Sequence, residues 1–114
     1  FLTSILPEAC TPAVPDGYVH VYHQYTIRLE GATGEERDRF VIALKEEYQV
    51  GSGVYYPIPN HRLPSLAPYV PGLELPNTEK VAAECVSLPV HPSLSQADRE
   101  RIVAAVNACA KAGA

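Results

Sequence analysis

The sequence has 114 residues, of which 46% are hydrophobic and 19% are charged, and its formal net charge is -4. This length and composition are typical of one globular domain with a single core, and they exclude a disordered chain. The acidic balance leaves no basic footprint for nucleic acid, and no apolar run approaches the roughly 20 residues of a membrane span.

The start of the chain suggests that it comes from a longer protein. It begins at Phe1 and contains no methionine, so we expect a fragment or a processed product. Residues 1–16 hold three prolines and show little periodicity, and we interpret them as the end of an upstream helix followed by a connector.

Three cysteines, Cys10, Cys85 and Cys109, form an odd set without C-x-x-C spacing. This pattern indicates neither a zinc site nor a full disulfide framework, although one disulfide stays open. Cys85 and Cys109 lie among small apolar residues and are predicted to be buried. We therefore expect a reducing, cytoplasmic setting.

The clearest strand is predicted over residues 18–29, where every second residue from Val19 to Leu29 should face the core. This alternation places His23 on the apolar face, where a core histidine with satisfied hydrogen bonds is favoured over a ligand. His20 is three residues away and therefore on the opposite face, so that the two histidines cannot chelate one metal.

A helix is predicted over residues 35–48. Thr33 and Glu36 have the spacing of a capping box just before it. The charged residues of the stretch 35–39 are interpreted as a solvated face. An apolar stripe at helical spacing should face the core, and it consists of Phe40, Val41, Leu44 and Tyr48.

Residues 51–61 (GSGVYYPIPNH) stand out as a tyrosine- and proline-rich stretch. Glycines on both sides of Ser52 permit close approaches that a Cβ would forbid. We predict a short strand that Pro57 ends and a stiffened loop after it. Because neighbours on a strand point to opposite faces, one of Tyr55 and Tyr56 should pack inward. A binding loop and a plain strand end with two half-buried tyrosines both remain open.

The last third of the chain alternates between loops and short elements. Residues 62–76 are predicted to be a long proline-rich loop that is functional or mobile. Asn77 should cap a helix over residues 78–84, and a strand over residues 86–89 follows. A capping box at Ser95 opens a last helix to about Ala110, with four residues facing inward: Ile102, Val103, Val106 and Cys109.

These elements predict an α+β two-layer sandwich: a small, mainly antiparallel sheet of about three strands with helices on one face. The sequence contains no G-x-S-x-G, H-E-x-x-H, P-loop or G-x-G-x-x-G motif. The residues by themselves therefore indicate an α+β module with a tyrosine-rich proline loop, and no enzymatic chemistry.

Three motifs carry a resemblance to a known family: HVYHQYTIR at residues 20–28, GVYYPIPNH at 53–61 and SLPVHPSL at 87–94. Their order and spacing resemble the C-terminal region of the DegT/DnrJ/StrS sugar aminotransferases. The resemblance implies a dimeric, pyridoxal-phosphate-dependent enzyme of fold type I. Such an enzyme transfers an amino group, usually from glutamate, to a keto sugar on a nucleoside diphosphate. A large N-terminal domain would carry the Schiff-base lysine, and this region would form the small domain beside the active site.

The resemblance also implies site residues. Tyr55 and Tyr56 match the two ring residues that approach the sugar nucleotide, and His61 is a further substrate-binding candidate. Tyr55 stands where many members have histidine, and a phenol titrates near pH 10, so hydrogen bonding is expected there instead of proton transfer. His91 is interpreted as structural, tying loop carbonyls together. No Schiff-base motif surrounds any of the three lysines, which are Lys45, Lys80 and Lys111.

We therefore expect residues 1–114 to be one small domain, with the cofactor-binding domain missing and residues 1–16 as the connector. The whole enzyme would make amino sugars for polysaccharides or glycosylated metabolites. The isolated chain should hold no pyridoxal phosphate and should be inactive. It should also expose an apolar patch contributed by residues 62–76 and 1–6. The alternative is an autonomous, non-catalytic binding or dimerisation module derived from that domain.

Overall fold

The computed structural model describes residues 9–112 as a three-stranded antiparallel sheet with helices packed on it. The strands are β1 (Ala9–Cys10), β2 (Tyr25–Leu29) and β3 (Cys85–Leu88), in the order β1-β2-β3. In the register of the central pair, Ile27 lies opposite Val86. The helices are α1 (Gly34–Tyr48), α2 (Pro76–Glu84) and α3 (Gln96–Ala112).

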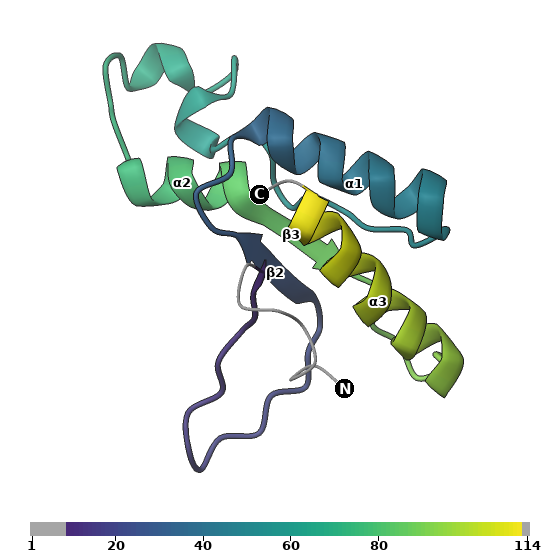
Figure 1. Cartoon of the computed structure of the whole chain (residues 1–114). Helices are drawn as coiled ribbons and strands as arrows, with labels where there is room; N and C mark the ends of the chain where they lie inside the picture. Colours follow the sequence, from purple (N-terminus) through teal and green to yellow (C-terminus); the bar gives the residue numbers. More distant parts are fainter. Residues whose placement is uncertain (1–8, 113–114) are drawn as a thin grey trace.

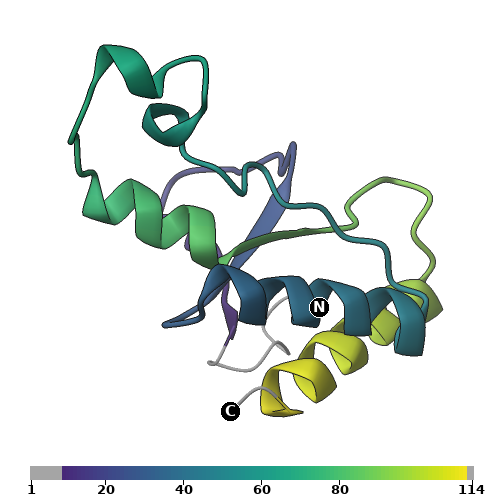
Figure 2. The ribbon, with the colours of Figure 1, turned by 90° about the horizontal axis from the view of Figure 1, so that it is seen from above.

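The two layers of the fold are plain in Figures 1 and 2, where α1 and α3 lie side by side against one face of the sheet. Residues of β2 alternate between buried and half-buried positions, as expected for a sheet with one covered face. The core is formed mainly by Tyr25, Ile27, Leu29, Phe40, Leu44, Val86, Leu88, Ile102, Ala105 and Val106. The predicted α+β sandwich is confirmed.

The predicted starts of the two long helices are correct. The Glu36 carboxylate accepts the Thr33 N–H at 2.7 Å, and the Thr33 hydroxyl accepts the Glu36 N–H at 3.3 Å. The Asp98 carboxylate accepts the Ser95 N–H at 3.0 Å, and the Ser95 hydroxyl accepts the Asp98 N–H at 3.1 Å, directly before α3. Each reciprocal pair satisfies backbone donors that a helix start leaves free.

The predicted cap of α2 is wrong. The helix begins at Pro76, so that Asn77 is already inside it, and the capping position is Leu75, whose side chain makes no cap bond. Proline at the first helical position has no N–H to satisfy, and its φ is already helical. The helix therefore starts two residues earlier than predicted.

The first predicted strand is shorter than expected. Only Tyr25–Leu29 pairs with neighbours, and residues 18–24 leave the sheet. Val19 and Val21 are 94% and 87% exposed, and His23 is exposed as well, so their predicted inward orientation is wrong. Alternation needs a partner strand, but β1 is two residues long and β3 ends at Leu88.

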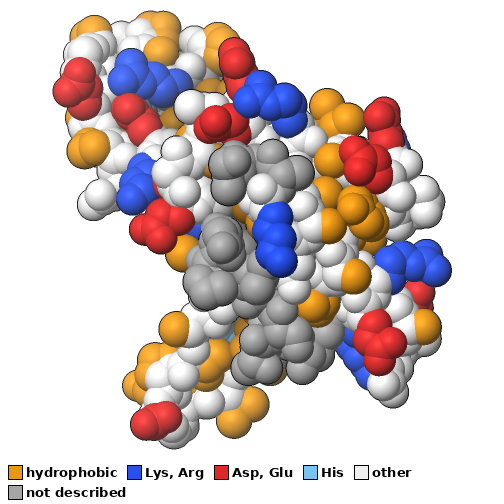
Figure 3. Space-filling model, in the orientation of Figure 1, with side chains coloured by type: hydrophobic (Ala, Val, Ile, Leu, Met, Phe, Trp, Pro, Cys, Tyr) orange, Lys and Arg blue, Asp and Glu red, His pale blue; other side chains and the backbone are white. Residues whose placement is uncertain are grey.

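Two segments project from the core, as Figures 1 and 3 show. The arm, residues 11–24, connects β1 to β2, and the lobe, residues 60–75, holds two 3-10 turns, η2 (Asn60–Arg62) and η3 (Ala67–Tyr69). Exposed apolar side chains occur in both segments: Tyr18, Val19, Val21, Leu66, Tyr69, Val70, Leu73 and Leu75. Residues 1–6, expected to add to this surface, lie outside the described residues.

The three cysteines are free, and Cys85 and Cys109 are buried as predicted. Burial raises the pKa of the Cys109 thiol, and the negative charge of Glu47 adds to the effect. A raised pKa disfavours the thiolate form that reactive cysteines require, so Cys109 fits a structural role in the core.

Candidate functional site

The tyrosine–proline stretch is attached to the sheet at one residue. The Gly53 N–H donates to the Ser87 carbonyl at 3.0 Å, and the Ser87 N–H donates to the Gly53 carbonyl at 2.7 Å. This single bridge replaces the predicted second strand, because the chain after it bends and Pro57 has no N–H for a ladder. The third strand of the sheet is β1 instead.

Both tyrosines of the stretch are exposed. Tyr55 is 51% and Tyr56 is 74% exposed, so the prediction that one of them packs inward is wrong. The prediction assumed an extended strand, whereas this segment contains an isolated bridge followed by bends. The two rings lie edge to face with their centroids 5.8 Å apart. Two phenols are therefore presented together on one surface.

His61, the third predicted site residue, is buried and turned toward α2. Its Nε2 lies 2.7 Å from Oε1 of Glu79, and its side chain is only 4% exposed. Because a carboxylate accepts, Nε2 carries the hydrogen, and the buried Nδ1 has no partner among the described residues. The structure therefore groups Tyr55 with Tyr56 and separates His61 from the exposed surface.

Glu79 joins the two ends of the lobe, a role that the sequence prediction missed. Its Oε1 also accepts from Arg62 Nη2 at 3.0 Å and from the Leu75 N–H at 3.3 Å. The hydrogen bond from His61, followed by those from Arg62 and Leu75, lowers the pKa of the Glu79 carboxyl to about 2. The sequence offered one indication of this role, which is the position of a carboxylate in the first helical turn after a proline that begins the helix.

Acid should therefore loosen the lobe through Glu79. The pKa of this carboxyl is depressed from 4.5 to about 2, so its contribution is complete above about pH 4.5 and is lost as the pH falls toward 2. We expect Glu79→Gln to flatten the fall in thermal midpoint between those two pH values. Glu74→Gln, an exposed carboxylate of the same lobe, is the control. Equal slopes for the two variants would contradict the assignment.

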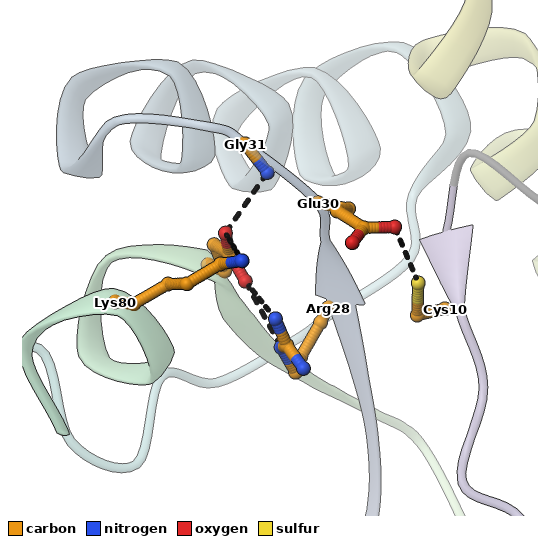
Figure 4. Close-up of polar contacts among 6 residues, drawn as sticks. Cys10, Arg28, Glu30, Gly31 and Lys80 are labelled. Carbon is orange, nitrogen blue, oxygen red and sulfur yellow. Dashed lines mark hydrogen bonds and ion pairs between the residues drawn. The ribbon is translucent and has the colours of Figure 1, made fainter. Parts of the chain in front are cut away.

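A second polar cluster fastens α2 to β2, as Figure 4 shows. Glu84, at the end of α2, accepts from Nε of Arg28 at 2.9 Å and from the Gly31 N–H at 2.9 Å. On the neighbouring strand, the Cys10 thiol donates to Glu30 at 3.4 Å, and this bond together with burial raises the pKa of the thiol. The cluster holds elements together, and its polar groups are already paired with one another.

His91 was interpreted as a residue that ties loop carbonyls together through its imidazole. The side chain is exposed and makes no hydrogen bond with another of the described residues, whereas the His91 backbone carbonyl accepts the Leu94 N–H at 3.2 Å. The interpretation of this imidazole as a tether is wrong.

Comparison with known proteins decides the family. The model of the DegT/DnrJ/EryC1/StrS aminotransferase family matches residues 3–107. The chain belongs to this family. Among curated relatives, the chain is 40% identical over 108 residues to a "pleiotropic regulatory protein" of Geobacillus stearothermophilus, covering 89% of this chain and 27% of the relative. It is 33% identical to the dTDP-3-amino-3,6-dideoxy-alpha-D-galactopyranose transaminase of Aneurinibacillus thermoaerophilus. That match covers 84% of this chain and 24% of the relative.

Two solved structures share the fold of this chain. DesV of S. venezuelae, in complex with a ketimine intermediate, superposes with a TM-score of 0.82 at 28% identity, covering 96% of this chain and 29% of that one. NtdA of Bacillus subtilis, with bound cofactor PMP, gives 0.76 at 27% identity, covering 92% and 23%. The chain thus spans about a quarter of the length of the relatives that it matches.

The lysines of the chain do not fit a pyridoxal-phosphate site. A Schiff-base lysine needs a desolvated or charge-tuned setting beside a positioned cofactor. Lys45 and Lys111 are exposed on helices, and the half-exposed Lys80 lies 4.0 Å from Glu84.

Within residues 9–112, no group of three or more His, Cys, Asp or Glu could hold a metal ion. None of the helices there combines the length and apolar character that a membrane crossing requires.

Proposed function

We propose that this chain is the C-terminal small domain of a pyridoxal-phosphate-dependent aminotransferase that acts on a nucleotide-linked keto sugar. Residues 1–16 would connect it to an N-terminal domain that supplies the cofactor and the Schiff-base lysine. The observation that carries the proposal is the family match over residues 3–107 in a chain that spans a quarter of its relatives' length. On its own, the chain would be inactive and free of cofactor.

The exposed apolar side chains of the arm and the lobe support this proposal. Val19 and Val21 are almost fully exposed, and Tyr69 is 82% exposed. Apolar surface of this kind is typical of a face that a larger neighbour covers. The proposed neighbours are the N-terminal domain and a second subunit of a homodimer.

The proposed substrate contacts are Tyr55 and Tyr56. Their hydroxyls can donate to and accept from a phosphate or a sugar hydroxyl, and both rings reach the surface. His61 is proposed to support the substrate site from beneath the exposed tyrosines. It is buried against Glu79 at the end of the same segment.

The length and the cofactor of the native protein test the proposal. An antibody against this chain should detect, in its source cells, a polypeptide several times longer than 114 residues. That polypeptide, once purified, should show a cofactor absorbance band that borohydride removes. A native protein of this length alone would favour the autonomous module. A borohydride-sensitive band in the 114-residue chain, mapped to one of its lysines, would contradict the proposed division of labour.

Substitution of the two tyrosines should change kinetics and leave stability unchanged. In the full-length enzyme, we expect Tyr55→Phe and Tyr56→Phe each to raise KM for the nucleotide sugar about 2- to 10-fold, the value of one hydrogen bond. Their thermal midpoints should stay unchanged because both hydroxyls are on exposed rings. Tyr69→Phe is the matched control on the lobe. If Tyr55→Phe and Tyr56→Phe have the same KM as the control Tyr69→Phe, neither tyrosine contacts the substrate.

A further inference from the structure

The ring of Tyr55 lies directly on the backbone of Gly53. A Cβ built on Gly53 would lie 2.6 Å from Cζ, 2.6 Å from Oη and 2.7 Å from Cε2 of Tyr55. A Cβ does not come within about 3 Å of a non-bonded heavy atom in packed proteins, because attractive contact between carbon atoms is reached only near 3.5–4.0 Å. The missing side chain of Gly53 therefore makes room for the hydroxyl end of the ring.

The backbone conformation at Gly53 does not itself require glycine. The glycines with positive φ in the described part of the chain are Gly17, Gly31 and Gly72. Gly51, two residues earlier, also lacks a positive φ, and a Cβ there would meet nothing within 4 Å. The contact with the tyrosine ring is therefore the reason why a side chain is excluded at Gly53.

The surface beneath the ring is held in place. Gly53 exchanges two backbone hydrogen bonds with Ser87 of β3, and the Ser87 hydroxyl lies 2.8 Å from the hydroxyl of Thr26 on β2. Beyond the ring, the segment ends at His61, which is bonded to Glu79 of α2. The segment that carries Tyr55 is therefore attached to β3 before the ring and to α2 after it.

We propose that Gly53 is a positioning residue that sets where the Tyr55 hydroxyl meets the nucleotide sugar. This inference rests on the proposed function, because it takes Tyr55 as a substrate contact. The atoms that a new Cβ would displace are the far end of a rotatable side chain. Gly53→Ala should therefore fold with the Tyr55 ring displaced from Gly53, so that substrate binding is weakened while the domain stays folded.

The test compares Gly53→Ala with Gly51→Ala in the full-length enzyme, each also in a Tyr55→Ala background. We expect Gly53→Ala to raise KM about 2- to 10-fold, as the loss of the hydroxyl contact does, with kcat changed less. Gly51→Ala should leave KM unchanged. In the Tyr55→Ala background, Gly53→Ala should add nothing, because the double-mutant cycle isolates the pairwise contact. In the 114-residue chain, the NMR signals of the Tyr55 ring should move in Gly53→Ala and not in Gly51→Ala.

The outcomes separate the inference from the proposed function. If Tyr55→Ala raises KM but Gly53→Ala matches Gly51→Ala, the positioning role is wrong and the substrate contact stands. If Tyr55→Ala leaves KM unchanged, the substrate contact fails and the positioning role fails with it. Should Gly53→Ala fail to fold, refolding in the Tyr55→Ala background would support the ring contact. A double variant that stays unfolded would overturn it.

Discussion

Replacement of Glu84 by alanine should cost about 3 kcal/mol of unfolding free energy, the lower end of the range for breaking a buried ion pair. The side chain is 2% exposed and is held by Arg28 and by the Gly31 N–H (Figure 4). Without the carboxylate, Gly31 loses its acceptor, and the buried end of α2 is left with a cavity. The lower end applies because the Arg28 side chain is 36% exposed and water can reach it.

The measurement is urea unfolding of the 114-residue chain at neutral pH, with Lys80→Ala as the control. Lys80 lies 4.0 Å from Glu84 and is half-exposed, so its removal should cost no more than about 1 kcal/mol. Glu84→Gln keeps an acceptor and should fall between the two. If Glu84→Ala unfolds at the same urea concentration as Lys80→Ala, the cluster does not stabilise the fold.

The Glu84 carboxyl also adds a pH dependence of known sign. Burial raises its pKa, but the hydrogen bonds and charge of Arg28 together with the Gly31 N–H outweigh burial, and the net pKa is lowered. Its contribution to stability is therefore present above the unfolded pKa and is lost as the pH falls through the folded value. Glu84→Gln should remove part of the acid sensitivity of the wild-type chain.

Replacement of Arg37 by alanine should cost about 2 kcal/mol, the middle of the range for leaving a buried polar group unsatisfied. Arg37 is 3% exposed, and its Nη1 donates to the Ala82 carbonyl at 2.9 Å. That carbonyl belongs to the last turn of α2, where carbonyls have no partner within the helix. The loss of the buried stem adds to the cost.

Arg39→Ala is the matched control, because Arg39 is exposed on the same helix. A surface substitution of this kind should stay within about 0.5 kcal/mol of wild type. Urea midpoints of the two variants decide the matter. Equal midpoints would show that the bond from α1 to α2 adds nothing to stability.

Arg37 also marks a limit of sequence-based prediction. The charged stretch at residues 35–39 was interpreted as a solvated face, and this is correct for Glu35 and Arg39. It is wrong for Arg37, because α2 lies against that position and offers a free carbonyl. Only the packing of α1 on α2, which are 45 residues apart at the bond, distinguishes one arginine from the other.

The same limit applies at the candidate site. Tyr55, Tyr56 and His61 could be selected from the family motif, but their exposure could not be predicted. His61 is buried, and the donor on its ring is satisfied by Glu79, which is 18 residues later in the chain. The glycines on both sides of Ser52 predicted a close approach to the backbone. The structure shows that this approach occurs at Gly53 and not at Gly51.

The sequence by itself determined the features that depend on residues close in the chain. The capping boxes at Thr33 and Ser95 and most of the buried stripes of α1 and α3 follow from interactions three or four residues apart. The tertiary structure alone decided which residues pair into strands. Apolar and polar residues alternate over residues 18–24 just as they do over Tyr25–Leu29. Only Tyr25–Leu29 lies beside β3. Strand formation depends on a distant partner, and a local pattern cannot report whether that partner is present.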